Sequence, residues 1–256
     1  MDARPRRLGL LVLAGAALAV LAAVLWLARS LDARAERALE AIGSELLGTR
    51  VSVGSVHIDL RGGRATVRGV EVENPRGGKL AFSKEPAIRC DEIDVAIEPA
   101  SLAGDAPIVL SEVRVRAPRL SAEVTPGGVN LLELERRVDA ASPAEVDEKV
   151  DGTAAPRRFL VRRLGFEGTS VRADSRPVGG DLRDLALADL ALTNVGAPRG
   201  ATAAELGQRV LQGLLTRALA ELARERVDAL VDEQLQQFKD KAAEAFRDLL
   251  GPRHRP

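Results

Sequence analysis

The chain of 256 residues carries 37 basic and 37 acidic side chains, so its formal net charge is zero. Only 2% of its residues are aromatic, so it lacks both the basic surface and the stacking side chains of nucleic-acid-binding proteins, and we expect no such partner. Its single cysteine, Cys90, cannot form an internal disulfide. The apolar alternation around Cys90 predicts a buried strand position, and a reactive thiol is the alternative.

A run of twenty residues without a charge, residues 8–27 (LGLLVLAGAALAVLAAVLWL), opens the chain. As a helix it would be about 30 Å long, which matches the hydrocarbon core of a bilayer. Arg4, Arg6 and Arg7 precede the run, whereas charges of both signs follow it. Because cytoplasmic flanks carry the excess of basic residues, we expect a cytoplasmic N-terminus and residues 30–256 across the membrane.

A cleaved secretory signal is the alternative interpretation of the same run. The run is longer than the roughly 7–15 apolar residues of a signal peptide, and Leu25-Trp26-Leu27 stands where a cleavage site needs small residues. Both interpretations predict that most of the chain is exported.

Residues 30–47 follow with apolar side chains at helical spacing, and Gly48 comes directly after them, as a helix-ending glycine does. We expect a short amphipathic helix that leads away from the membrane. Its apolar residues are Leu31, Ala35, Ala38, Leu39, Ile42, Leu46 and Leu47.

From Arg50 onward, apolar and polar residues alternate in five successive segments that end at Gly, Pro or Asn. This pattern is typical of an antiparallel sheet with one solvent-exposed face. The segments are RVSVGSVHIDL, ATVRGVEVENP, AIRCDEIDVAIEP, IVLSEVRVRAP and RLSAEV.

The apolar spacing changes from two residues to three once in each of four segments. Such a shift turns the following side chains to the opposite face unless a bulge or bend absorbs it. We therefore predict bends in register across the sheet, which would curl it; two short strands divided by a kink are the alternative. The four places are Val53 to Val56, Val67 to Val70, Cys90 to Ile93, and Leu110 to Val113.

The pattern recurs at an offset of 51 residues, which predicts an internal repeat of a strand–strand–turn unit. We expect residues 182–194 to continue the second copy as a longer strand, and residues 136–157, between the copies, to form a flexible loop. Ile108, Leu110, Val113, Val115, Leu120, Ala122, Pro126, Gly128, Leu131 and Leu134 match Phe159, Val161, Leu164, Phe166, Val171, Ala173, Pro177, Gly179, Leu182 and Leu185.

The last fifty residues have a helical pattern that opens with a capping-box signature, Thr202 and Glu205. The apolar stripe changes face near residues 224–227, which predicts a break or two separately docked helices. We expect them to pack against the sheet; a free helix that binds a partner is the alternative, because the second stripe is close to a heptad.

No set of side chains suggests catalysis or a bound metal or cofactor, and we expect neither. His57 lies among the polar residues of a strand and His254 near the C-terminus, so they and Cys90 offer no metal site or nucleophile–base pair. Paired glycines lie between strands, as turns require, and none opens a helix as a phosphate-binding loop does.

The anchor, the short helix and the segments LGTRVSVGSVHIDL, GGRATVRGVEVENP, IDVAIEPASL and PIVLSEVRVRAPRLSAEV, followed by GGVNLL, resemble the N-terminal region of the AsmA family, which includes TamB-like and YhdP-like proteins of the Gram-negative envelope. The resemblance covers residues 8–134 and extends to the repeat. It implies a single-pass inner-membrane protein with a periplasmic β-groove whose apolar concave face carries phospholipid acyl chains toward the outer membrane. About nine strands would make a groove on the order of 40 Å, far shorter than that of envelope-spanning members.

We therefore expect a mainly β fold with α: a transmembrane anchor (1–29), a curled antiparallel groove domain (30–200) and a helical segment (201–256). The expected function is lipid binding that contributes to phospholipid transport or outer-membrane biogenesis. A structural scaffold or assembly factor that contacts other envelope proteins through the C-terminal helices is the alternative. The candidate lipid contacts are Val56, Ile58, Leu60, Val70, Val72, Ile93, Val95, Ile97, Val113 and Val115.

Overall fold

The computed structural model describes residues 31–77, 81–151 and 156–224. The predicted membrane span and the second C-terminal stripe lie outside these ranges. Within them, no helix has the length and apolar character needed to cross a membrane.

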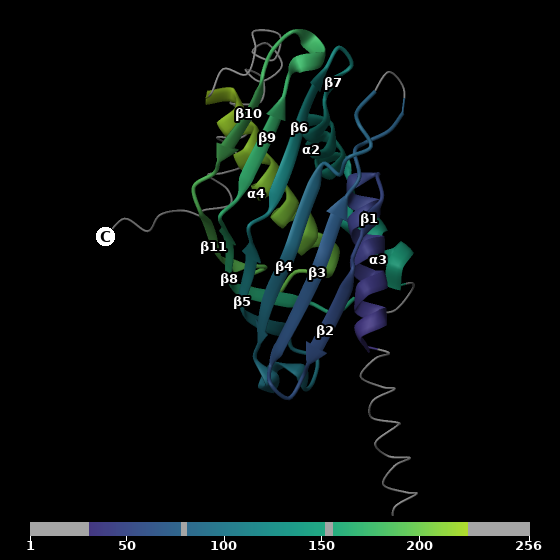
Figure 1. Cartoon of the computed structure of the whole chain (residues 1–256). Coiled ribbons are helices and arrows are strands. Elements are labelled where there is room, and N and C mark those ends of the chain that lie inside the picture. Colours follow the sequence, from purple (N-terminus) through teal and green to yellow (C-terminus); the bar gives the residue numbers. More distant parts are fainter. Residues whose placement is uncertain (1–30, 78–80, 152–155, 225–256) are drawn as a thin grey trace, which may run out of the picture.

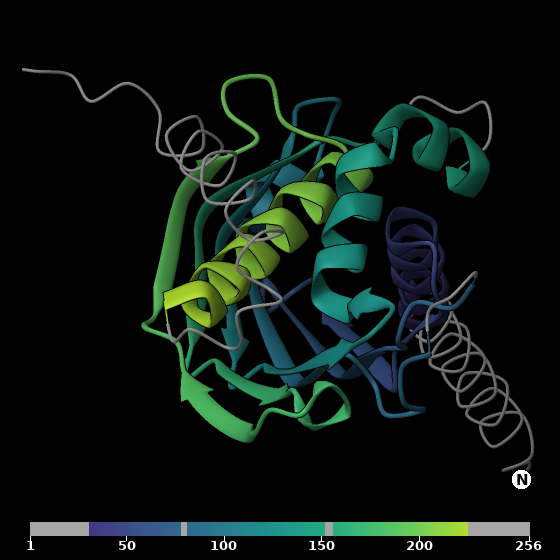
Figure 2. The same ribbon diagram turned by 90° about the horizontal axis from the view of Figure 1, so that it is seen from above.

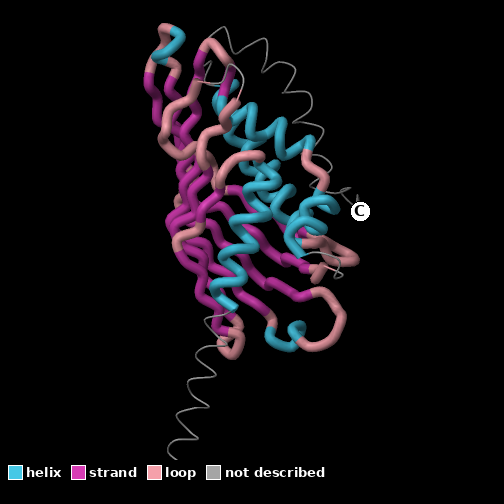
Figure 3. Tube along the Cα trace, turned by 90° about the vertical axis from the view of Figure 1, so that its right-hand side faces the viewer, coloured by secondary structure: helices cyan, strands magenta, loops and turns pink. Residues whose placement is uncertain are grey.

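A mixed sheet of eleven strands forms one layer, and helices cover one of its faces (Figures 1 and 3). Its main path runs β10-β9-β6-β4-β5-β8-β11, while β3 pairs with β4, β1 and β2. The strands are β1 (Val51–Ser52), β2 (Ser55–Asp59), β3 (Arg64–Val72), β4 (Ile88–Ile97), β5 (Ile108–Arg116), β6 (Arg119–Thr125), β7 (Gly128–Val129), β8 (Phe159–Glu167), β9 (Ser170–Asp174), β10 (Leu182–Ala186) and β11 (Leu190–Val195). The helices are the first helix (residues 31–47), α2 (Asn130–Ala140), α3 (Pro143–Asp151) and α4 (Ala203–Arg224), with 3-10 turns η1 (Pro99–Leu102) and η2 (Arg176–Val178).

Most strands are halves of longer strands that are interrupted at one common line across the sheet. For example, β5 and β6 continue in a single register along β4 and are separated only by Ala117 and Pro118. Positive φ angles at Gly69 (65°), Ala117 (45°) and Gly168 (63°) bend the backbone there. We call the row the kink line; counted through the strand registers, it passes through Gly54, Gly69, Asp91, Ala117, Gly168 and Ala188.

The kink line resets the alternation of side chains, so the apolar residues on both sides of it face the helices. Three of the four predicted spacing changes lie on this line, and Val53 and Val56 on either side of it are both buried. The fourth lies elsewhere, where Ser111 is the extra residue opposite Ala96 and Ile97. The predicted curl is confirmed, because the sheet wraps as a half-barrel around α2 and α4 (Figure 2). The two interpretations, a bend within a continuous strand and two short strands divided by a kink, each hold for part of the sheet. β3 and β4 stay continuous, whereas the other long strands split.

The expectation of an all-antiparallel sheet is wrong, because the repeat brings its second copy beside the first in parallel. β5 pairs with β8 and β6 with β9, both in parallel and in the register of the 51-residue offset. Each matched strand position is therefore a direct cross-strand pair, such as Val115 with Phe166 and Leu120 with Val171. Parallel neighbours need a long crossover, and the segment between the copies provides it.

The predicted flexible loop at 136–157 is also wrong in large part, because this crossover contains α2 and α3. Leu131, Leu134 and Val138 recur at helical spacing and are fully buried in the core. Pro143 begins α3, where its missing N–H is no loss. This helical spacing went unrecognised in the sequence, because Leu131 and Leu134 match Leu182 and Leu185 of β10 in the repeat. After the Pro–Gly turn the two copies differ: the first continues as α2 and the second as β10.

The predicted helices at 30–47 and from 202 are confirmed within the described residues. Thr202 N donates to Glu205 Oε2 at 3.0 Å and Glu205 N donates to Thr202 Oγ at 3.1 Å, which is a reciprocal capping box. Gly48 ends the first helix with φ +56°. The predicted packing of the C-terminal segment on the sheet holds for α4, which buries Leu215 and Leu219 in the main core.

The first helix lies along the β1–β2 edge and satisfies its free amide groups. Ile58 N donates to Asp32 Oδ1 at 2.9 Å, and Val53 N donates to Glu40 Oε1 at 2.8 Å. Side-chain acceptors therefore replace a neighbouring strand, which protects this edge from pairing with another chain.

Candidate functional site

The concave face of the sheet is apolar along its whole length. The kink line crosses this face and separates it into two halves. We call the side toward the start of the first helix the near half, and the opposite side the far half. On the far half, Val72, Ile88, Leu120 and Val171 are buried in the same cluster as the leucines of α2. The far half is therefore filled by the protein's own side chains.

On the near half, α4 covers only the strands at one side. Leu164 of β8 and Leu192 of β11 are buried in the cluster that contains α4, and Leu192 Cδ1 would lie 3.7 Å from a Cβ placed on Gly213. Over β2 to β5, Val56, Val67 and Val115 beside the kink line are buried, whereas the other apolar side chains of the concave face are half-buried. We call these half-buried side chains the half-covered surface: Ile58, Ala65, Ile93, Val95, Ile97, Leu110 and Val113.

Cross-strand pairing places these residues together on the concave face. Val95 lies opposite Ala65 on one side and Val113 on the other. Ile97 lies opposite Leu110 in the next row. Cross-strand partners point to the same face of a sheet, so the rows form one apolar area between the first helix and α4.

The ten predicted lipid contacts divide by exposure. Val56, Val72 and Val115 are buried against neighbouring core residues, and Leu60, in the turn after β2, is 42% exposed. The other six are half-buried: Ile58, Val70, Ile93, Val95, Ile97 and Val113. The prediction missed Ala65 and Leu110, although both belong to the apolar pattern of their segments. The strand register places them opposite Val95 and Ile97.

The convex face carries charged side chains joined in ion pairs. Arg68 Nε lies 3.0 Å from Glu92 Oε2. Arg116 Nη2 lies 2.6 Å from Asp94 Oδ2. Asp94 precedes Val95 in β4, so its side chain points to the opposite face. Since unsolvated charge is very unfavourable in hydrocarbon, only the concave face can accept acyl chains.

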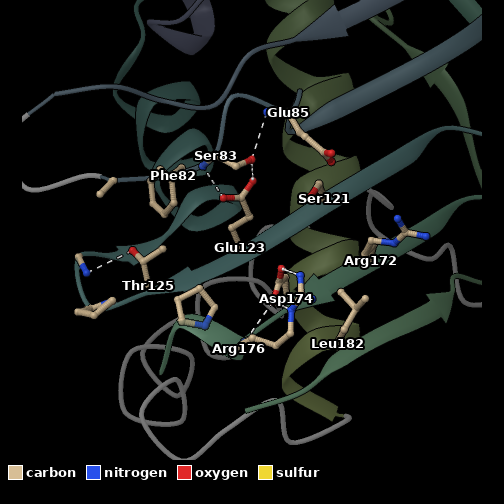
Figure 4. A pocket seen from close by; sticks show the side chains of 14 residues that line it. Phe82, Ser83, Glu85, Ser121, Glu123, Thr125, Arg172, Asp174, Arg176 and Leu182 are labelled. Carbon is tan, nitrogen blue, oxygen red and sulfur yellow. Dashed lines mark hydrogen bonds and ion pairs between the residues drawn. The ribbon is translucent and has the colours of Figure 1, made fainter. Parts of the chain in front are cut away.

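A hollow of about 710 Å³ opens on the convex face of the far half (Figure 4). Two of its carboxylates are already engaged. Glu123 accepts hydrogen bonds from Asn74 and from the amide and hydroxyl of Ser83, at 2.6–2.8 Å. Arg176 makes two hydrogen bonds to Asp174, which hold the pKa of that carboxyl below its ordinary value. The arrangement ties the loop before β4 and the turn after β9 to the sheet.

Reactive groups within the described residues lie apart from one another. Cys90 is buried as predicted, and burial raises the pKa of its thiol, which lowers its reactivity. His57 Nδ1 lies 3.6 Å from Asp32 Oδ2 at the exposed edge of the sheet. Among residues 31–77, 81–151 and 156–224, no cluster of His, Cys, Asp and Glu could hold a metal ion.

Comparison with known protein families and with curated proteins gives no match to this chain. The class that the geometry defines is a curled, mixed β-sheet whose concave apolar face is partly filled by helices.

Proposed function

We propose that the chain is an inner-membrane-anchored periplasmic protein of AsmA type, whose half-covered surface binds phospholipid acyl chains and contributes to phospholipid transport or outer-membrane biogenesis. The observation that carries the proposal is the contrast between the two halves of the concave face. Helices bury the far half, whereas Val95, Ile97 and Val113 on the near half remain partly exposed to solvent. A contiguous apolar area that the protein leaves partly uncovered is unfavourable in water, and such areas commonly mark binding surfaces.

The position of the surface also supports the proposal. Its near end lies where the first helix begins, because Asp32 in the first turn of that helix accepts the amide hydrogen of Ile58. The apolar run at 8–27 ends four residues before Leu31. The half-covered surface therefore lies beside the proposed anchor, where acyl chains are available.

The described sheet is too short to carry lipid across an envelope alone, so we propose that it acts as one module of a larger assembly. The order of elements that resembles the AsmA family supports this role. A structural scaffold is the second candidate, and one observation favours it: α2 and α4 already fill most of the concave face, as a closed scaffold requires.

Site-specific photo-crosslinking in cells tests the proposal. A photo-reactive residue at Val95 or Val113 should capture phospholipid, because these side chains are only half-buried on the concave face. The matched controls are Asp94 and Arg114, which pair with each other across the same two strands but lie on the convex face. Mass spectrometry of the purified protein would identify the attached lipid.

A buried position on the concave face provides a second control for the same experiment. A photo-reactive residue at Val72 should capture no phospholipid, because Val72 is buried in the cluster that contains the leucines of α2. Lipid captured equally at Val95 and Asp94, or at neither position in a folded and membrane-bound protein, would contradict lipid binding and leave the scaffold as the better candidate.

A further inference from the structure

The near end of the domain exposes two leucines close to the proposed anchor. Leu31 is 36% exposed and Leu60 is 42% exposed. The hydrogen bond from Ile58 N to Asp32 places the β2–β3 turn beside the first turn of the helix. The end of β4 and the start of η1 lie against this turn, since Ile97 N donates to Gly63 O at 2.8 Å and Pro99 Cγ would lie 3.1 Å from a Cβ placed on Gly63. These segments form one surface, which we call the tip: the turn 60–63, Arg64 and the start of the first helix.

The turn that carries Leu60 is constrained by its own hydrogen bonds. Asp59 Oδ1 accepts the amide hydrogens of Arg61 at 3.1 Å and of Gly62 at 2.9 Å. Gly63 has φ +62°, and a Cβ there would lie 2.6 Å from Ile97 O, so only glycine fits. Leu60 is therefore presented on a preorganised turn although it is exposed to solvent.

Arginines at the tip have no carboxylate partner among the described residues, unlike those on the convex face. Arg34, Arg61 and Arg64 are exposed and make no ion pair there. Arginine packs its apolar stem beside hydrocarbon while its guanidinium donates to phosphate oxygens. The paired arginines of the convex face are Arg68, Arg89, Arg114, Arg116, Arg119 and Arg172.

We propose that the tip rests in the headgroup layer of the bilayer that holds residues 8–27, with Leu60 among the first acyl carbons and Arg61 and Arg64 on lipid phosphates. Four residues of chain reach at most about 14 Å, so Leu31 cannot lie far from the end of the span. The inference rests on the proposed function and adds the source of the lipid. The half-covered surface opens directly into the periplasmic leaflet, and an acyl chain reaches it without crossing water.

Bromolipid quenching in nanodiscs tests this contact. The full chain with Cys90→Ala would carry a small fluorescent thiol label at Leu60→Cys, in discs of phosphatidylethanolamine and phosphatidylglycerol with brominated acyl chains. The matched control is Leu182→Cys, which replaces a leucine that is 44% exposed at the far end of the sheet. Leu60 and Leu182 lie on opposite sides of the kink line, about 40 Å apart along the strands.

We expect brominated lipid to quench the label at Leu60→Cys severalfold more than the label at Leu182→Cys. Equal quenching at the two sites would overturn the contact. Arg61→Gln combined with Arg64→Gln should reduce the quenching, whereas Arg162→Gln, which removes a pair with Glu98, should not. Unchanged quenching in the double variant would overturn the role of the arginines.

The two experiments separate the two proposals. Lipid capture at Val95 without quenching at Leu60→Cys would keep lipid binding and remove the membrane contact of the tip. Quenching at Leu60→Cys without capture at Val95 would keep the contact and remove lipid binding.

Discussion

Asn130 connects three parts of the fold through a single amide group. It is fully buried, and its Nδ2 donates to Asn74 Oδ1 and to Ser121 O, both at 2.7 Å. Its Oδ1 accepts the amide hydrogens of Glu123 and Leu131 at 2.8 Å. The loop before β4, the strand β6 and the start of α2 are thereby joined without a buried charge pair.

Replacing Asn130 by leucine should destabilise the protein by about 2–4 kcal/mol, because a side chain of similar size leaves several buried polar groups without a partner. Urea unfolding of the purified chain would measure the loss. The matched control is Gln212→Leu, which removes an exposed hydrogen bond to Asp139 and should change stability by no more than about 0.5 kcal/mol. Similar losses in the two variants would show that the network around Asn130 contributes little.

The sequence could not predict this role of Asn130, although the residue belongs to the GGVNLL motif. Its partner Asn74 lies 56 positions away. Only strand pairing brings the loop that follows β3 beside the start of α2. The burial of Cys90, by contrast, was predictable because it depends only on alternation within its own strand.

At the scale of elements, alternation predicted where most of the strands lie. The longer strand expected at 182–194 is wrong, because these residues form β10 and β11, which the kink line separates and which pair with β9 and β8. Alternation also placed the bends, because a change of spacing is a local property of each strand. The direction of pairing was not predictable from alternation, since parallel and antiparallel neighbours share the same period of two. The 51-residue offset equals the register of the parallel pairing between the two copies. The copies can lie parallel because the crossover between them contains helices.

We expect α4 to be an integral part of the core. Ending the chain at Ala201 should lower the thermal midpoint of the remaining domain, because Leu164 and Leu192 would lose their cover. Leu215→Ala in the full chain should cost about 2–5 kcal/mol, because the side chain is fully buried. Leu39→Ala serves as the control, since Leu39 is 42% exposed on the first helix. A midpoint unchanged by the truncation would favour a free helix that binds a partner.

At the scale of the whole molecule, the helices and the sheet divide the concave face unequally. The far half has a complete core, which stabilises the fold, while the near half keeps apolar side chains partly exposed beside the proposed anchor. This division is consistent with a domain that folds on one half and binds on the other. This division could not be predicted from the sequence, because both halves have the same apolar pattern and differ only in how much of each the helices cover.

The proposed function requires the domain to lie in the periplasm and to stay attached to the membrane. Alkaline phosphatase fused after Pro256 should be active, because its disulfides form only outside the cytoplasm. A green fluorescent protein at the same position, exported unfolded, should stay dark.

The intact chain should remain in the membrane fraction at its full mass, since Leu25-Trp26-Leu27 offers no site for signal cleavage. An active fusion that is released from the membrane after losing its first residues would instead establish a cleaved signal, and the lipid surface would then have no anchor beside it. An inactive phosphatase together with a bright fluorescent fusion, in chains of full length, would place the domain in the cytoplasm and refute the topology that Arg4, Arg6 and Arg7 predict.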